Sequence, residues 1–136
     1  MSVWRAIVAI ATVAVLLAPV AGCNSDTSSP SRIYSVTYYL SITGNQSTVT
    51  VLTYRDSSGI VTVNNPTNGW SVQVTVSGGT TIGMTSQGTV NNGTIQINLQ
   101  GNETTGNDQV TGQDSCTAQG VAVACSLAIP DSTLPS

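Results

Sequence analysis

The sequence predicts an all-β fold, a single antiparallel β-sandwich of about seven strands with an immunoglobulin-like arrangement, preceded by an N-terminal signal or anchor helix. Three observations lead to this class. Apolar and polar residues alternate with a period of two along several segments, which is typical of strands with one buried face. Turn-forming residues recur roughly every 8–12 positions, as they do between the short strands of a sandwich. After the N-terminal apolar segment at residues 6–18, no helical periodicity is found.

The first three strands are expected at Tyr34–Thr43, Ser47–Tyr54 and Ile60–Val63. Every second residue of the first strand is apolar, so one of its faces should be buried. The sequence Asp-Ser-Ser-Gly at 56–59 separates the second strand from the third, because Asp and Gly both favour turns. Asn-Asn-Pro at 64–66 ends the third strand, since proline cannot donate a hydrogen bond to a ladder.

The next three strands are expected at Trp70–Val76, Thr80–Val90 and Thr94–Gln100. Trp70 and the valines that follow it share one face of their strand. Glycines interrupt the segment 80–90, which is therefore the weakest of the three. Asn92-Gly93 predicts a tight type I′ hairpin into the following strand, because both residues tolerate the positive φ angles of that turn.

The last strand is expected at Val121–Ile129, where larger apolar residues alternate with small ones. The preceding stretch, Gly101–Gly120, has no clear period. We expect it to form a long loop, with part of an additional edge strand as the alternative.

The composition excludes several classes of function. The chain has 3 Lys+Arg against 6 Asp+Glu, no His and a formal net charge of −3. Without a basic patch it cannot neutralise phosphates, so nucleic-acid binding is not expected. Without His or Lys it lacks the commonest general base and the amine nucleophile. Two carboxylates could serve as a glycosidase pair, but nothing in the sequence marks such a pair. We expect no enzyme, no catalytic residues and no cofactor.

The N-terminus has the pattern of a bacterial lipoprotein signal. An apolar run follows Arg5 and is too short to span a membrane comfortably. Val-Ala-Gly-Cys at 20–23 resembles the lipobox, in which the cysteine is acylated, for example with palmitate, and becomes the mature N-terminus. An ordinary signal with an accidental cysteine and an uncleaved anchor are the alternatives. Lipidation of Cys23 predicts a location on the extracytoplasmic face of the cell membrane, with the lipid anchor in the bilayer.

These patterns divide the chain into four segments. Residues 1–22 are expected to be the signal peptide, and residues 23–31 the lipidated cysteine with a polar tether. Residues 32–130 should form the β-sandwich domain, and residues 131–136 a C-terminal tail.

Two further cysteines, Cys116 and Cys125, remain once Cys23 is assigned to the lipid. In an exported protein such a pair predicts a structural disulfide. A redox-active pair is the alternative, but the C-x-x-C spacing and the nearby cations that lower a thiol pKa are missing.

Acidic and aromatic residues offer two candidate binding sites. Glu103, Asp108 and Asp114 could supply oxygen ligands to calcium, but the EF-hand spacing is absent and a solvated loop is the preferred interpretation, so no metal is expected. Tyr39 lies opposite the face that carries Tyr34 and Tyr38, and it is the candidate for an exposed aromatic that contacts a ligand. Trp70 is expected in the core.

Several segments resemble a known family. The N-terminal apolar segment, the polar tether, Tyr34-Ser-Val-Thr-Tyr38 and Leu52-Thr-Tyr-Arg-Asp-Ser-Ser-Gly59 are similar to the MmpS family (mycobacterial membrane protein small) and to similar actinobacterial lipoproteins. Trp70 at the start of an alternating strand, Gly93-Thr-Ile-Gln-Ile97 and the late Cys125 fit the same pattern. Family members usually keep an uncleaved transmembrane helix, whereas Cys23 predicts a lipid anchor here.

The resemblance implies a small extracytoplasmic β-sandwich that assists a resistance-nodulation-division (RND, MmpL-type) exporter of lipids or siderophores. The expected function is therefore that of a lipid-anchored, non-enzymatic accessory to such an exporter or to envelope assembly, with a polytopic membrane transporter as partner. A module that binds a cell-envelope glycan or a small ligand is the alternative, with Tyr39 or the 101–120 stretch as the contact.

Overall fold

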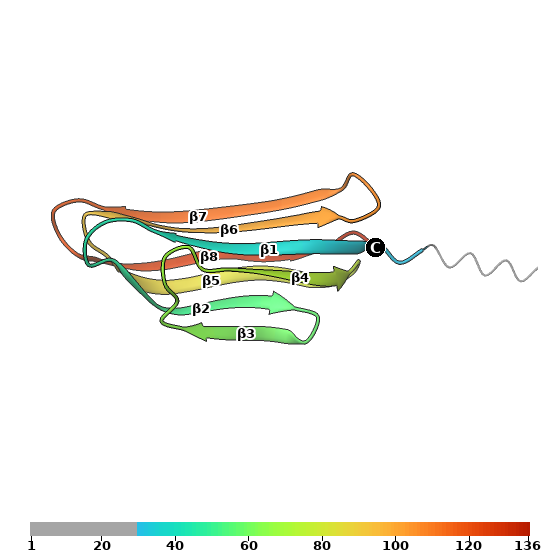
Figure 1. The fold of residues 1–136 in the computed structure, drawn as a ribbon, viewed down its shortest axis with the longest axis horizontal. Coiled ribbons are helices and arrows are strands. Elements are labelled where there is room, and N and C mark those ends of the chain that lie inside the picture. The colour runs from blue at the N-terminus through green and yellow to red at the C-terminus, as the bar shows by residue number, and fades with distance from the viewer. Residues whose placement is uncertain (1–29) are drawn as a thin grey trace, which may run out of the picture.

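The computed structural model describes residues 30–136, which form eight strands in two antiparallel four-stranded sheets (Figure 1). Sheet A has the order β4 (Ser71–Ser77), β1 (Ile33–Ile42), β6 (Gly93–Glu103) and β7 (Gln109–Ala118). Sheet B has the order β3 (Gly59–Asn64), β2 (Thr48–Asp56), β5 (Thr81–Val90) and β8 (Val123–Thr133). The all-β antiparallel prediction is confirmed.

The inner faces of both sheets contribute to one hydrophobic core. The alternation seen in the sequence is the cause: the even-numbered residues of β1 from Tyr34 to Leu40 are buried and the odd-numbered ones face outward. Tyr38 of sheet A lies 5.0 Å from Tyr54 of sheet B between ring centroids. The largest fully buried side chains are Tyr34, Tyr38, Leu40, Leu52, Ile82, Met84, Ile95, Ile97, Leu134, Val36 and Val90.

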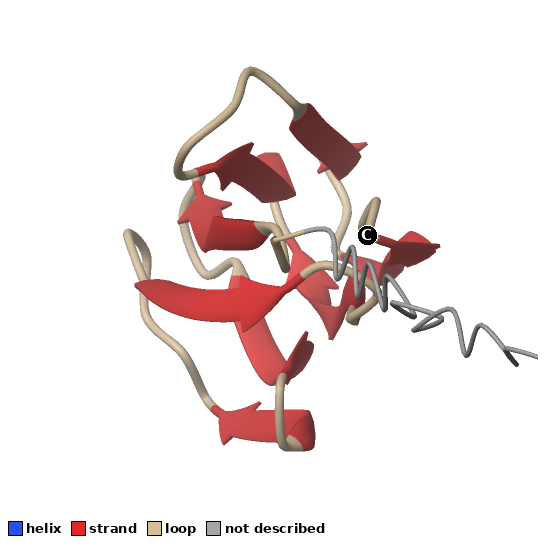
Figure 2. Cartoon of the chain, turned by 90° about the vertical axis from the view of Figure 1, so that its right-hand side faces the viewer, coloured by secondary structure: helices blue, strands red, loops and turns tan. Residues whose placement is uncertain are grey.

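The chain enters the domain at one end of the strands, which we call the entry end, and Ser136 lies at the same end (Figure 1). Figure 2 looks at this end, and every regular element that residues 30–136 form in it is a strand. Accordingly, residues 30–136 contain no helix that could cross a membrane. The expected signal peptide with its helix and Cys23 lie outside the described residues, as does nearly all of the tether.

The order of the strands differs from the predicted immunoglobulin-like arrangement. In the immunoglobulin fold the first two strands pair within one sheet, whereas β1 and β2 belong to different sheets here. The hairpin expected at Asn92-Gly93 was also wrong, because β5 and β6 lie in different sheets. Of these two residues, only Asn92 has a positive φ, of 46°, whereas a type I′ turn needs a positive φ at both. The pair therefore connects the two sheets rather than forming a type I′ turn.

The long loop expected at Gly101–Gly120 was largely wrong, because Gln109–Ala118 forms the complete edge strand β7. Its inward positions are occupied by Val110, Gly112, Asp114, Cys116 and Ala118, which are mostly small or polar. Gly112 faces the core, and the side chain of Ile129 fills the space that a side chain at position 112 would need. Since an edge strand at the side of the molecule buries little apolar surface, the period-two signal was lost.

The C-terminal boundary also differs from the expected one. β8 continues to Thr133, and the following residue, Leu134, is 2 % exposed. Its backbone exchanges hydrogen bonds with the β4–β5 turn, because Leu134 N donates to Thr80 O and Gly79 N donates to Leu134 O. Most of the segment expected as a tail is therefore part of the fold. The strand starts at Val123 rather than at Val121, and both valines are exposed rather than buried.

Candidate ligand-binding face

The outer face of sheet A carries side chains of one chemical kind, each with a hydroxyl or a carboxamide. We call this surface the polar face. It consists of Ser71, Gln73 and Thr75 on β4, Ser35, Thr37, Tyr39 and Ser41 on β1, Gln96, Asn98, Gln100 and Asn102 on β6, and Gln109, Thr111, Gln113 and Ser115 on β7. None of these residues is charged.

Tyr39 is the aromatic residue of the polar face. The register of the strands places Ser71 on one side of it and Asn98 on the other, with Gln113 beyond Asn98. Tyr39 is 40 % exposed, as the alternation of β1 predicts. Gln96 Nε2 donates a hydrogen bond to Asn98 Oδ1 at 3.3 Å, which orients the amide beside the ring. An exposed ring thus stands within a row of hydrogen-bonding groups.

A shallow hollow of about 390 Å³ lies between β6 and β7 on the same face. Its rim is formed by Asn98, Gln100, Thr111 and Gln113, all members of the polar face. Half of this rim comes from β7, the segment expected as a loop, so no pattern in the sequence indicated the hollow.

The charged residues of the described segment lie outside the polar face. Arg32 contacts both Glu103, at 3.9 Å, and Asp108 at the entry end. Arg55 pairs with Asp131 at 2.7 Å, also near that end. Because these charged residues lie elsewhere, the outer face of sheet A carries no formal charge.

The three acidic residues considered as calcium ligands do not converge. Glu103 and Asp108 flank Arg32, whereas Asp114 accepts hydrogen bonds from Ser115 N and Ala128 N, both at 2.9 Å. The calcium alternative is therefore not favoured by the geometry. Within residues 30–136, no three His, Cys, Asp or Glu side chains gather as they would around a metal ion.

Trp70 is partly buried and packs against the core, with its ring 5.7 Å from that of Tyr54. Trp70 directly precedes β4 and lies on the same inward side as Val72 and Val74, so it is not part of the polar face.

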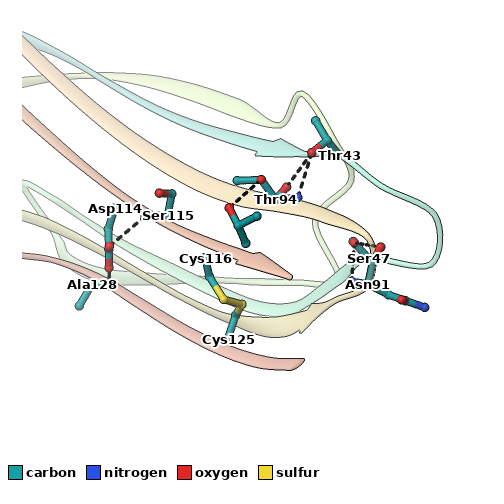
Figure 3. Close-up of a disulfide and its surroundings, with 10 residues drawn as sticks. Thr43, Ser47, Asn91, Thr94, Asp114, Ser115, Cys116, Cys125 and Ala128 are labelled. Carbon is teal, nitrogen blue, oxygen red and sulfur yellow. Dashed lines mark hydrogen bonds between the residues drawn. A yellow bond between two sulfur atoms is a disulfide. The ribbon is translucent and has the colours of Figure 1, made fainter. Parts of the chain in front are cut away.

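Cys116 and Cys125 form a disulfide, as predicted, with Cα atoms 6.1 Å apart (Figure 3). The bond joins β7, an edge of sheet A, to β8, an edge of sheet B. The hydrogen bond from Ala128 N to Asp114 links the same two strands farther along. Together they close one side of the molecule and hold β7, with its part of the polar face, in place.

Beneath the polar face, Tyr38 gives the domain a pH-dependent stability. Burial raises the pKa of its hydroxyl from 10.0 to about 12. The folded state keeps a proton that the unfolded chain releases above pH 10, so the free energy of unfolding should fall as the pH rises from about 10 to about 12. Tyr38→Phe should remove most of this fall, measured by urea unfolding across that range. The exposed Tyr39→Phe is the control, and an unchanged alkaline fall in Tyr38→Phe would contradict the assignment.

Comparison of the chain with protein-family models, with curated proteins and with solved structures finds no match.

Proposed function

We propose that this chain is an exported, lipid-anchored, non-enzymatic module that binds a neutral glycan of the cell envelope on its polar face. The observation that supports this proposal is the joint presence of an exposed tyrosine and an uncharged array of hydroxyls and carboxamides on one sheet surface.

The chemistry of the array suits sugars better than other ligands. Hydroxyls and carboxamides each donate and accept hydrogen bonds, as the hydroxyls of a sugar do. The amphipathic Tyr39 ring offers an apolar surface to the face of a pyranose and a polar tip to its edge. A phosphorylated or strongly acidic ligand would find no cation on this surface, whereas a neutral glycan needs none.

The test is the binding of soluble neutral polysaccharides, such as a glucan, a galactan and an arabinan, in affinity electrophoresis of the full chain in detergent. Tyr39→Ala should weaken binding to the preferred polysaccharide by about tenfold, since loss of an aromatic contact costs on the order of 1.4 kcal/mol. The matched control is Ile60→Ala, which removes an exposed side chain from sheet B. Equal loss in both variants, or binding only to an acidic polysaccharide such as polygalacturonate, would contradict the proposal.

The second candidate is the accessory role beside an RND (MmpL-type) exporter or in envelope assembly, which rests on the resemblance to the MmpS family. Val121 and Val123 favour it, because they are 71 % and 45 % exposed at the β7–β8 turn, away from the entry end, and could contact an apolar partner surface. In-cell crosslinking that recovers a polytopic transporter with both wild type and Tyr39→Ala, but not with Cys23→Ala, would favour this candidate over the glycan-binding module.

A further inference from the structure

The two sides of the molecule, where edge strands of the two sheets face each other, are built differently. On one side β7 and β8 are joined by the disulfide and by the Asp114 carboxylate. On the other side lie β4 and β3, which do not pair with each other. Their inward residues Val61, Val63, Val72 and Val74 are only partly buried. This second side therefore leaves apolar surface and two strand edges without a covering element in residues 30–136.

On the edge of β4 that faces away from β1, every second residue has backbone groups without a partner strand in residues 30–136. Leu40 N donates to Trp70 O at 2.9 Å, and Gly78 N donates to Arg32 O at 2.7 Å, so the even-numbered residues of β4 direct their backbone groups toward β1. Backbone groups alternate in direction along an antiparallel strand. Consequently Ser71, Gln73, Thr75 and Ser77 present their N–H and C=O groups at the open edge.

The sequence of β4, Ser-Val-Gln-Val-Thr-Val-Ser, is nearly the same read in either direction from Val74. When two copies run antiparallel about Val74, valine stands opposite valine on the inner face. On the outer face serine stands opposite serine, and glutamine opposite threonine. No charge or proline interferes, although these are common devices that prevent edge pairing in natural proteins. β3 lacks this property, because antiparallel pairing about Thr62 places Ile60 opposite Asn64.

We propose that β4 pairs with β4 of a second copy of this chain, antiparallel about a two-fold axis at Val74. In this register the four residues with free backbone groups all face one another, Ser71 to Ser77 and Gln73 to Thr75. They can exchange about eight hydrogen bonds, since each donates and accepts once in both copies. A two-fold contact uses the same surface on both partners, as the symmetric sequence requires.

The pairing would also bury part of the open side. The partner's Val74 would stand opposite Val74 of the first copy and its Val76 opposite Val72, and together they would cover Val72 and Val74 from water. The two polar faces would then form one continuous surface, because directly opposite residues point to the same side of a sheet. This inference does not depend on what the polar face binds.

The test uses charge pairs at the two outward positions of β4 in the full chain, with mass measured by sedimentation equilibrium in a density-matched detergent. Wild type should sediment as a dimer in a concentration series. Gln73→Lys with Thr75→Lys places lysine opposite lysine twice, which should raise the dimer dissociation constant by at least about tenfold. Gln73→Glu with Thr75→Lys places opposite charges together and should restore the wild-type dissociation constant or lower it.

The matched control is Thr62→Lys with Asn64→Lys, which puts the same charges on the outward positions of β3 and should leave the dimer intact. Thermal unfolding of each variant checks that the fold is preserved. Wild type that stays monomeric at the highest concentration overturns the proposal. So does equal weakening by the β3 and β4 lysine pairs, or failure of the Gln73→Glu and Thr75→Lys combination to restore the dimer.

Discussion

Gly93→Ala is expected to destabilise the domain by about 3 kcal/mol, the upper end of the usual range for a forced overlap in a packed site. A Cβ atom on Gly93 would stand 2.1 Å from Thr43 O and 2.6 Å from the Cα atom of Gly44. Both are backbone atoms, so no side chain can rotate away. The same close approach, where the antiparallel pairing of β1 and β6 continues past Ile42 and Ile95, excludes a Cβ on Gly44, which would lie 2.3 Å from Asn92 O. Here the end of β1 and the start of β6 touch backbone to backbone.

The measurement is urea unfolding followed by circular dichroism, with the slope of the transition compared between variants. Gly101→Ala is the matched control in the same strand, because its nearest contact would be Val36 Cγ2 at an ordinary 3.5 Å. It should change the free energy of unfolding by less than about 1 kcal/mol. A Gly93→Ala protein as stable as Gly101→Ala would show that the paired ends of β1 and β6 can move apart without cost.

Replacing Cys116 and Cys125 together with serine is expected to lower the free energy of unfolding by about 2.5–3 kcal/mol. The disulfide closes a loop of sequence separation 9, and that range is the chain-entropy cost of releasing a loop of this length. For a domain of this size the corresponding fall in Tm is about 10–20 °C. Loss of the bond also frees β7 from β8, so amide exchange in β7 should rise more than in β1.

Thermal unfolding of the oxidised protein, with and without a reducing agent, supplies the control. Wild type under reducing conditions should match the double serine variant, and the variant itself should not respond to the reductant. If the reductant lowers Tm in the variant as well, the loss does not come from this disulfide.

Local patterns were sufficient for the strands that bury one full face. The alternation in β1 and β6, the Asp-Ser-Ser-Gly turn and the pairing of the two cysteines were all predictable, because each depends on residues close together or on simple elimination. The Asp56 carboxylate accepts a hydrogen bond from Ser58 N at 2.7 Å in that turn, as its sequence suggests.

What could not be predicted depends on long-range arrangement. Gly112 of β7 looks like a loop residue until Ile129 is seen to fill the space beside it. The outward polar residues of β1, β4 and β6 could be identified one strand at a time. Their union into one uncharged surface depends on a strand order that places β1 between β4 and β6. The exposure of Tyr39 followed from the sequence, whereas its polar neighbours did not.

The chain enters β1, which starts at Ile33, at the same end of the strands as the C-terminal Ser136 (Figure 1). With the proposed anchor on Cys23, both of these residues would face the membrane. The ten-residue strand β1 would carry the β1–β2 loop about 33 Å farther out, at 3.3 Å per residue. An epitope tag placed after Ser136 would then lie nearer to the bilayer than one inserted at Asn45, by about the length of β1. Surface labelling should therefore use the β1–β2 loop.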